Sequence, residues 1–269
     1  MNVQLDNKTV QVETGGKPHD PSKPTIAFIH GAGMDHTIWS LQSRYFAHHG
    51  YSVLAIDLPG HGGSEGPPLS SIEEMADWIQ GLVQTLSPNP VGLIGHSMGA
   101  LVALETAAQY PGLVIALGLI GISVPMPVNT DLLAKTQNDI PAAVKLIVSW
   151  AFGRRAHIGG TQTPGLWMLG GGRQLLLKSS DGQLYADFQA CNNYADGLQA
   201  AAKIKCPTLL VAGSDDRMTP PRSVENLGQN IKNSKTTIIP SAGHMMMIEE
   251  PDLMLKTLSE FSSSHIGAN

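Results

Sequence analysis

Short apolar runs alternate with segments of helical spacing over most of this chain. The runs TIAFIH, YSVLAID, PVGLIG and VIALGLIG are almost continuously apolar, which is typical of strands buried on both faces of a parallel sheet. Helical patterns lie between them at about 38–48, 70–86 and 98–109. After residue 203 the alternation returns with PTLLVAG, a further helix, KTTIIP and a final helix from about Met246. This order predicts a doubly wound α/β fold.

The alternation breaks between residues 124 and 202. Helical stretches such as AAVKLIVSWAF are separated there by GGTQTPG and GGG, which interrupt regular structure. We therefore expect a helical insertion at 124–202 between two parts of one core, at 1–123 and 203–269. A continuation of the core whose pattern is obscured is the alternative. At the start of the chain, the alternating sequence VQLDNKTVQVE predicts a β-hairpin.

The overall composition narrows the classes of function. With 269 residues, of which 42% are hydrophobic, the chain can bury a large core. Its formal charge of −5 comes without clusters of Lys and Arg, so no nucleic-acid partner is expected. The first ten residues lack the apolar stretch of a secretory signal and no run is long enough to span a membrane, which favours a cytoplasmic protein. Cys191 and Cys206 lack metal-ligand spacing, and we expect neither a metal nor a cofactor.

Two segments match the GxSxG pattern of serine hydrolases, and their context distinguishes them. Ser97 lies between the predicted strand PVGLIG and the helical stretch MGALVALETAAQY, with Gly95 and Gly99 on either side. A nucleophilic serine needs this tight strand-to-helix turn and small neighbours. Ser64 is followed by EGPP, and the paired prolines prevent a helix from starting directly behind it. We therefore predict Ser97 as the nucleophile and interpret Ser64 as a loop hydroxyl.

Candidate partners for Ser97 follow later in the chain. Asp216 comes after the predicted strand PTLLVAG, at the carboxyl edge of the sheet, where a carboxylate can orient a histidine. Its neighbour Asp215 is the alternative acid. His244 lies in PSAGHMMM, between a strand and the last helix, and is the predicted general base.

Two backbone N–H groups are predicted to form an oxyanion hole. One belongs to Met98, directly after the nucleophile, and the other to Ala32 in the small-residue sequence HGAG. His30 and His96 adjoin these residues in the sequence, and we interpret both as structural residues that orient the loops.

These motifs resemble the α/β-hydrolase superfamily, in particular the capped branch that holds carboxylesterases, monoacylglycerol lipases and meta-cleavage-product hydrolases. The matching motifs are HGAG, DLPGHGGS, GHSMGA, GSDDRMTP and SAGHMMMIEEPD, which span nearly the whole core. The resemblance implies an α/β-hydrolase fold with a mostly parallel, doubly wound, eight-stranded sheet and an inserted helical cap. It also implies that the acid is Asp216 and not Asp215, and that Ser64 belongs to a structural loop motif.

The sequence departs from the relatives that cleave carbon–carbon bonds. Those hydrolases typically carry Asn before the serine and Trp after the histidine, where this chain has His96 and Met245. We therefore expect a carboxylic-ester hydrolase that forms an acyl-enzyme. Cleavage of a carbon–carbon, thioester or lactone bond by the same triad is the alternative, and a ligand receptor on this fold is a third possibility.

The expected partner is a small-molecule ester with a small to medium apolar acyl group. Residues predicted to contact it are Trp167, Met168 and Met245. Further candidates for the lining of an apolar pocket are Met126, Trp150, Phe152 and the other methionines of the run 245–247. Candidate contacts for an anionic group are Arg154, Arg155 and Arg173. The natural substrate and the oligomeric state stay open.

Overall fold

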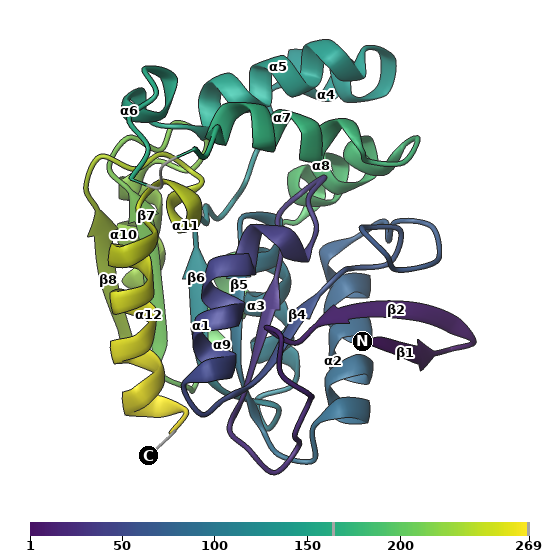
Figure 1. Ribbon diagram of the computed structural model, residues 1–269, viewed down its shortest axis with the longest axis vertical. Coiled ribbons are helices and arrows are strands. Elements are labelled where there is room, and N and C mark those ends of the chain that lie inside the picture. Colours follow the sequence, from purple (N-terminus) through teal and green to yellow (C-terminus); the bar gives the residue numbers. More distant parts are fainter. Residues whose placement is uncertain (163–164, 268–269) are drawn as a thin grey trace.

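An eight-stranded sheet organises the computed structural model, which describes residues 1–162 and 165–267 (Figure 1). The strands are β1 (Asn2–Leu5), β2 (Lys8–Glu13), β3 (Thr25–Ile29), β4 (Ser52–Ile56), β5 (Val91–His96), β6 (Val114–Ile120), β7 (Thr208–Gly213) and β8 (Ser234–Ile239). They lie in the order β1-β2-β4-β3-β5-β6-β7-β8. Strands β3 to β8 pair in parallel, and the hairpin of β1 and β2 joins β4 in antiparallel orientation. The predicted sheet and hairpin are confirmed.

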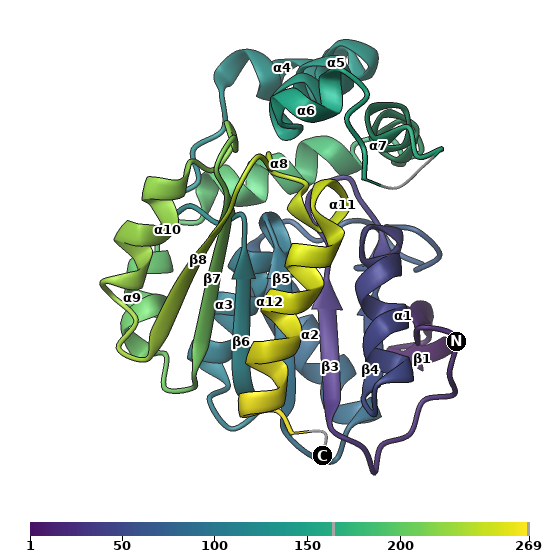
Figure 2. The same cartoon turned by 60° about the vertical axis from the view of Figure 1, so that its left-hand side comes forward.

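Helices cover both faces of this sheet. They are η1 (His36–Trp39), α1 (Ser40–His48), α2 (Ile72–Leu86), α3 (Met98–Gln109), α9 (Gly197–Lys203), α10 (Pro221–Gly228), α11 (Met246–Glu249) and α12 (Pro251–His265). Helices α1 and α12 pack together on one face, whereas α3 packs between α2 and α9 on the other (Figures 1 and 2). The buried faces of β3, β4 and β5 therefore lie between two helical layers, which explains their continuous apolar runs.

Helix boundaries follow the local chemistry of the sequence. Helix α2 begins where the Ser71 hydroxyl caps it by accepting a hydrogen bond from the Glu74 N–H at 3.1 Å. The predicted final helix is interrupted: α11 ends before Glu250, and α12 starts at Pro251. Proline has no N–H for the helical hydrogen bond, but it fits the first turn of a new helix.

Five helices from segment 124–202 lie over the carboxyl ends of the strands (Figures 1 and 2). They are α4 (Thr130–Asn138), α5 (Ile140–Ala151), α6 (Arg154–His157), α7 (Met168–Leu177) and α8 (Gln183–Asn193). The loops that follow β3, β5 and β7 end beneath them, so the residues predicted for catalysis lie between the sheet and these helices. Across the described residues, every helix is too short or too polar to span a bilayer.

Candidate active site

Ser97 occupies the sharp turn between β5 and α3. Its backbone has φ 53° and ψ −117°, a conformation that a non-glycine residue adopts only under constraint from its surroundings. The Ser97 N–H donates to the Ile120 carbonyl at 2.8 Å, which ties the turn to the neighbouring strand β6. The turn therefore holds the serine side chain at the carboxyl edge of the sheet, as the nucleophile-elbow pattern predicts.

The two glycines of GHSMG are required by close packing around this turn. A Cβ atom on Gly95 would lie 2.0 Å from the Gly99 carbonyl oxygen, and one on Gly99 would lie 2.4 Å from the His30 carbonyl oxygen. No side chain fits at such distances. The sequence pattern around Ser97 is thus explained by the backbone crossing between α3 and the end of β3.

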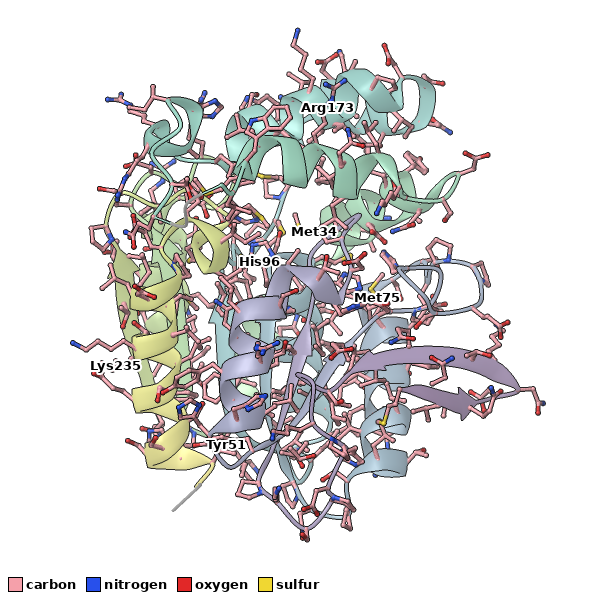
Figure 3. All side chains as sticks on the ribbon, viewed as in Figure 1. Met34, Tyr51, Met75, His96, Arg173 and Lys235 are labelled. Atoms are coloured by element: carbon pink, nitrogen blue, oxygen red, sulfur yellow. The ribbon has the colours of Figure 1, made fainter. Side chains whose placement is uncertain are left out.

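His244 is held next to the serine turn by its backbone and by its ring. The His244 N–H donates to the Ala151 carbonyl at 2.6 Å, and His96 Nε2 lies 3.0 Å from the His244 carbonyl oxygen. The rings of His96 and His244 are 4.6 Å apart between centroids. Figure 3 shows His96 at the upper end of the sheet, beneath the helices of segment 124–202.

Asp216 binds the far side of the His244 ring. Its Oδ2 lies 2.8 Å from His244 Nδ1, and both side chains are almost fully buried. Among the described residues His244 Nε2 has no hydrogen-bond partner. Burial raises the pKa of Asp216, but the electrostatic interaction with the His244 ring and several hydrogen bonds outweigh it and leave that pKa below its ordinary value. An ionised Asp216 with Nδ1–H leaves Nε2 as the proton acceptor, which is the arrangement a general base requires.

Thr219 is a part of this site that the sequence did not reveal. Its hydroxyl donates to Asp216 Oδ2 at 2.7 Å, and its N–H and that of Met218 donate to Asp216 Oδ1 at 2.9 Å and 2.8 Å. Among the described residues, the Asp215 side chain instead accepts only from the Ser214 hydroxyl, at 3.2 Å. Thr219 lies three residues after Asp216, in the sequence DRMT. This spacing is the signal by which the sequence could have indicated a turn around the carboxylate.

Ser64 lies in a loop away from these groups. Its hydroxyl donates to the Asp57 carbonyl at 2.7 Å and accepts from the Gln11 N–H at 2.9 Å. The serine therefore joins the loop after β4 to the hairpin strand β2. Ser64 is therefore a loop residue whose hydroxyl has a structural role, as the paired prolines after it predicted.

The amides of Ala32 and Met98 lie on either side of the serine turn. Met98 is the first residue of α3, so its N–H has no partner within the helix. Among the described residues, neither amide donates to another backbone group. A Cβ built on Gly31 would lie 3.2 Å from the Ser97 Cβ, so the loop that carries Ala32 contacts the serine directly. The two N–H groups are available for the role of oxyanion donors.

A cavity of about 430 Å³ opens at Ser97 and Ala32. Its apolar lining includes Met126, Leu132, Trp150 and Phe188, and its polar lining includes Asn129, Arg217 and Thr219. Of the candidates from the sequence, Met126 and Trp150 line this cavity, whereas Trp167, Met168 and Met245 do not. Trp167 is 75% exposed, whereas Met168 and Met245 are buried and line a second, apolar cavity of about 190 Å³. Met168 is the first residue of helix α7, so the packing of that helix, and not the position of the serine, determines where the side chain lies.

The arginines proposed from the sequence lie apart from this cavity. Arg155 forms an ion pair with Glu250 at 2.7 Å, and Arg173 is exposed on helix α7 at the top of Figure 3. Arg154 lines a neighbouring hollow together with Arg217. Among the described residues that line the serine cavity, the cationic side chain is that of Arg217, next to the candidate acid in sequence. No cluster of potential metal ligands occurs in residues 1–162 and 165–267.

Buried neutral histidines make the stability of this region dependent on pH. His30 Nδ1 lies 2.9 Å from the Gly31 carbonyl oxygen, and Nε2 accepts from the Leu58 N–H, which fixes one neutral tautomer. Burial, with the nearby charge of His61, lowers the pKa of His30 to about 4. Burial also lowers the pKa of His96 well below its ordinary value. The unfolded chain therefore binds protons here that the folded protein does not, and the free energy of unfolding falls as the pH falls from 6.5. Glu249, whose burial raises its pKa to about 6, acts in the opposite direction.

We expect replacement of His30 by Gln to flatten this dependence. The amide can donate and accept as the imidazole does but does not titrate, so the variant lacks a contribution of about 2 kcal/mol between about pH 6.5 and pH 5. Urea unfolding of both proteins across this range measures the difference. Parallel curves for the two proteins would contradict the assignment of a neutral buried His30.

The chain belongs to the alpha/beta hydrolase family, whose model matches residues 26–257. Among curated relatives it is similar to the (E)-2-((N-methylformamido)methylene)succinate hydrolase of Acinetobacter baylyi, with 25% identity over 91% of this chain and 94% of that protein. It is also similar to the pimeloyl-[acyl-carrier protein] methyl ester esterase of Neisseria meningitidis, with 27% identity over 88% of this chain and 76% of that one. These relatives support hydrolase activity.

Solved structures agree on the fold. A thermophilic esterase superposes with a TM-score of 0.81 and 26% identity, covering 99% of this chain and 98% of its own. The enol-lactonase of Burkholderia xenovorans superposes with a TM-score of 0.84 over 98% of this chain and all of its own, at 22% identity. The eight-stranded α/β-hydrolase fold predicted from the sequence is therefore confirmed.

Proposed function

We propose that this protein hydrolyses carboxylic esters through an acyl-enzyme on Ser97. In this mechanism His244 Nε2 takes the proton of the Ser97 hydroxyl as its oxygen attacks the ester carbonyl. The amides of Ala32 and Met98 donate to the oxyanion, and His244 then gives the proton to the leaving alcohol. Water attacks the acyl-enzyme with the same histidine as base, which releases the acid and restores Ser97.

The observation that carries this proposal is the pairing of Asp216 with His244. A carboxylate 2.8 Å from Nδ1, with Nε2 without a partner among the described residues, fits the tautomer that can deprotonate a serine. Ser97 and His244 share the neighbour His96, and Ser97 lines the cavity from which a substrate would approach. A ligand receptor would need none of these oriented groups.

Helices α4 to α8 act in this proposal as a cap over the catalytic edge. Met126 lies in the chain that leads into α4, Leu132 lies on α4, and Trp150 lies near the end of α5. The cavity they line with Ser97, about 430 Å³, suits a small to medium apolar acyl group. Trp150, one of the candidates from the sequence, and Leu132 take the substrate-contact role in place of Trp167.

A panel of p-nitrophenyl esters of increasing acyl length tests the reaction, with a carbon–carbon substrate, a thioester and a lactone run beside it. We expect repeated turnover of short and medium esters and labelling of a single serine by a fluorophosphonate. Faster cleavage of the lactone or the carbon–carbon substrate would move the proposal to the alternative bond. A stoichiometric burst without further turnover would favour a receptor.

We expect Arg217 to make the protein prefer esters that carry an ionised group in addition to the ester group. Among the described residues that line the cavity, it is the one with a charged side chain. The relative from A. baylyi is named for a succinate derivative, which is an anionic substrate. We therefore propose that Arg217 binds a carboxylate on the substrate, through a charge-assisted hydrogen bond.

Replacing Arg217 by Gln is expected to lower kcat/KM for the p-nitrophenyl monoester of glutaric acid by roughly 10- to 100-fold, the loss of one charged hydrogen bond. The neutral butyrate ester should change by less than about threefold. The matched control is Arg154→Gln, since Arg154 lines the neighbouring hollow and is not among the described residues that line the serine cavity. Equal losses on the anionic and the neutral ester would remove Arg217 from substrate binding.

A further inference from the structure

One buried carboxylate of helix α8 reaches into the loop that carries Ala32. Asp187 Oδ2 accepts from the Gly33 N–H at 2.7 Å and lies 2.8 Å from His61 Nε2. The side chains of Asp187 and His61 are both fully buried. Gly33 follows β3 and His61 follows β4, so one side chain from segment 124–202 joins two loops at the carboxyl edge of the sheet.

His61 holds this carboxylate as an ion pair. Its Nδ1 lies 3.0 Å from the Pro59 carbonyl oxygen and its Nε2 faces Asp187, so both ring nitrogens face oxygen acceptors. Two acceptors require two N–H donors, which makes this ring an imidazolium. Although burial lowers the pKa of His61, the charge of Asp187 and its hydrogen bond raise that pKa above its ordinary value.

The segment from Gly31 to Met34 is a tight turn whose central peptide is fixed by Asp187. The Met34 N–H donates to the Gly31 carbonyl at 3.2 Å, and Gly33 has φ +67° at the third position. The Gly33 N–H belongs to the peptide between Ala32 and Gly33. A reversed peptide would direct the Ala32 carbonyl at the carboxylate, so Asp187 selects one of the two orientations of this turn. Figure 3 shows Met34, the last residue of the turn, beneath the helices.

We propose that Asp187 is a positioning residue for the oxyanion hole: by binding the Gly33 N–H, it fixes the turn that presents the Ala32 N–H to the substrate. The inference rests on the proposed ester hydrolysis, since Ala32 is a donor in that reaction. It also makes the contact of Asp187, on helix α8, with this turn a condition for full activity. A helix that shifts away removes the carboxylate from the turn.

A second anchor of the same helix region supplies a matched control. Tyr194, directly after α8, donates its hydroxyl to the buried carboxylate of Glu105 on α3. Both anchors tie the end of segment 124–202 to the core through a buried carboxylate. Glu105 lies on α3 and not in the turn from Gly31 to Met34, so loss of the Tyr194 anchor leaves the turn intact.

The test compares Asp187→Ala with Tyr194→Phe on p-nitrophenyl butyrate and on a trifluoromethyl ketone inhibitor, whose serine adduct carries an oxyanion. We expect Asp187→Ala to lower kcat by roughly 10- to 100-fold with little change in KM, and to weaken the inhibitor by a similar factor, somewhat less than loss of a donor. Tyr194→Phe should change both values by less than about threefold. Urea unfolding of each variant establishes that it is folded under the assay conditions.

If the alanine variant does not fold, Asp187→Asn replaces it as the test variant. Asparagine keeps the shape of the side chain and an acceptor oxygen for the Gly33 N–H but loses the charge. It should fall between wild type and the expected alanine value on both readouts. Equal effects of the Asp187 and Tyr194 variants, or a loss of kcat without any weakening of the inhibitor, would overturn the inference. Failure of wild type to turn over any ester would instead contradict the proposed function.

Discussion

Replacement of Ser97 by Ala should reduce ester turnover by roughly a millionfold, because it removes the nucleophile and leaves only binding and the oxyanion donors. A residual rate on the order of 10³-fold above water is expected from those donors. The fold is retained, since alanine is smaller and the strained backbone of Ser97 is held by Gly95, Gly99 and the Ile120 carbonyl. Steady-state kinetics with an active-site fluorophosphonate as a second readout measures the loss.

Ser64→Ala is the control for this variant, because it removes a serine from the same sequence pattern. It deletes two hydrogen bonds, to Asp57 and from Gln11, and we expect a loss of about 1–3 kcal/mol in the free energy of unfolding. Turnover and labelling should stay near those of wild type. Full activity of Ser97→Ala, or a label attached to Ser64, would contradict the assigned nucleophile.

Asp216→Asn is expected to lower kcat by roughly 10⁴-fold, the size of this substitution in a serine-protease triad. The carboxamide no longer requires a hydrogen on His244 Nδ1, so the imidazole can turn to the tautomer that carries its hydrogen on Nε2. That tautomer cannot accept the serine proton. Kinetics on a neutral p-nitrophenyl ester measures the effect without involving the charge of Arg217.

The matched variant is Asp215→Asn, one residue earlier in the same loop. Within the part of the chain that the structure describes, the Asp215 side chain accepts only from Ser214, so its loss should cost less than about threefold in kcat. A large loss for Asp215→Asn with a small one for Asp216→Asn would transfer the role of the acid to the neighbouring residue.

The local geometry of the serine turn follows from the sequence because adjacent residues determine it. An apolar strand, flanking glycines and a following helix predicted the position of Ser97, and Gly95 and Gly99 prove to face backbone atoms. The choice between Asp215 and Asp216 did not follow from local spacing alone. It depends on which carboxylate turns inward, where Thr219 and two amides bind it.

Most of the lining of the cavity could not be predicted in the same way, although Met126 and Trp150 were among the candidates. Trp167 and Met168 come from segment 124–202, whose helices acquire their positions by packing on the core and on one another. Helical spacing says which residues share a face of a helix but not which cavity that face meets. Arg217 was not predicted, because an arginine after an acidic pair is typical of an ordinary surface segment. Only the fold brings it to the cavity of Ser97.

The end of helix α5 has a consequence for engineering this protein. The Ala151 carbonyl accepts the His244 N–H at 2.6 Å, and Glu249 accepts from both Gly153 and Gly243, at 2.8 Å and 3.0 Å. Gly153 and Gly243 also face each other: a Cβ on Gly243 would lie 2.4 Å from the Gly153 nitrogen, which leaves no room for it. The helices over the site are thus fastened to the histidine loop and cannot be exchanged as an independent module. A chimera that takes these helices from a relative would have to keep residues 151–153, or it would displace the general base together with the old substrate pocket.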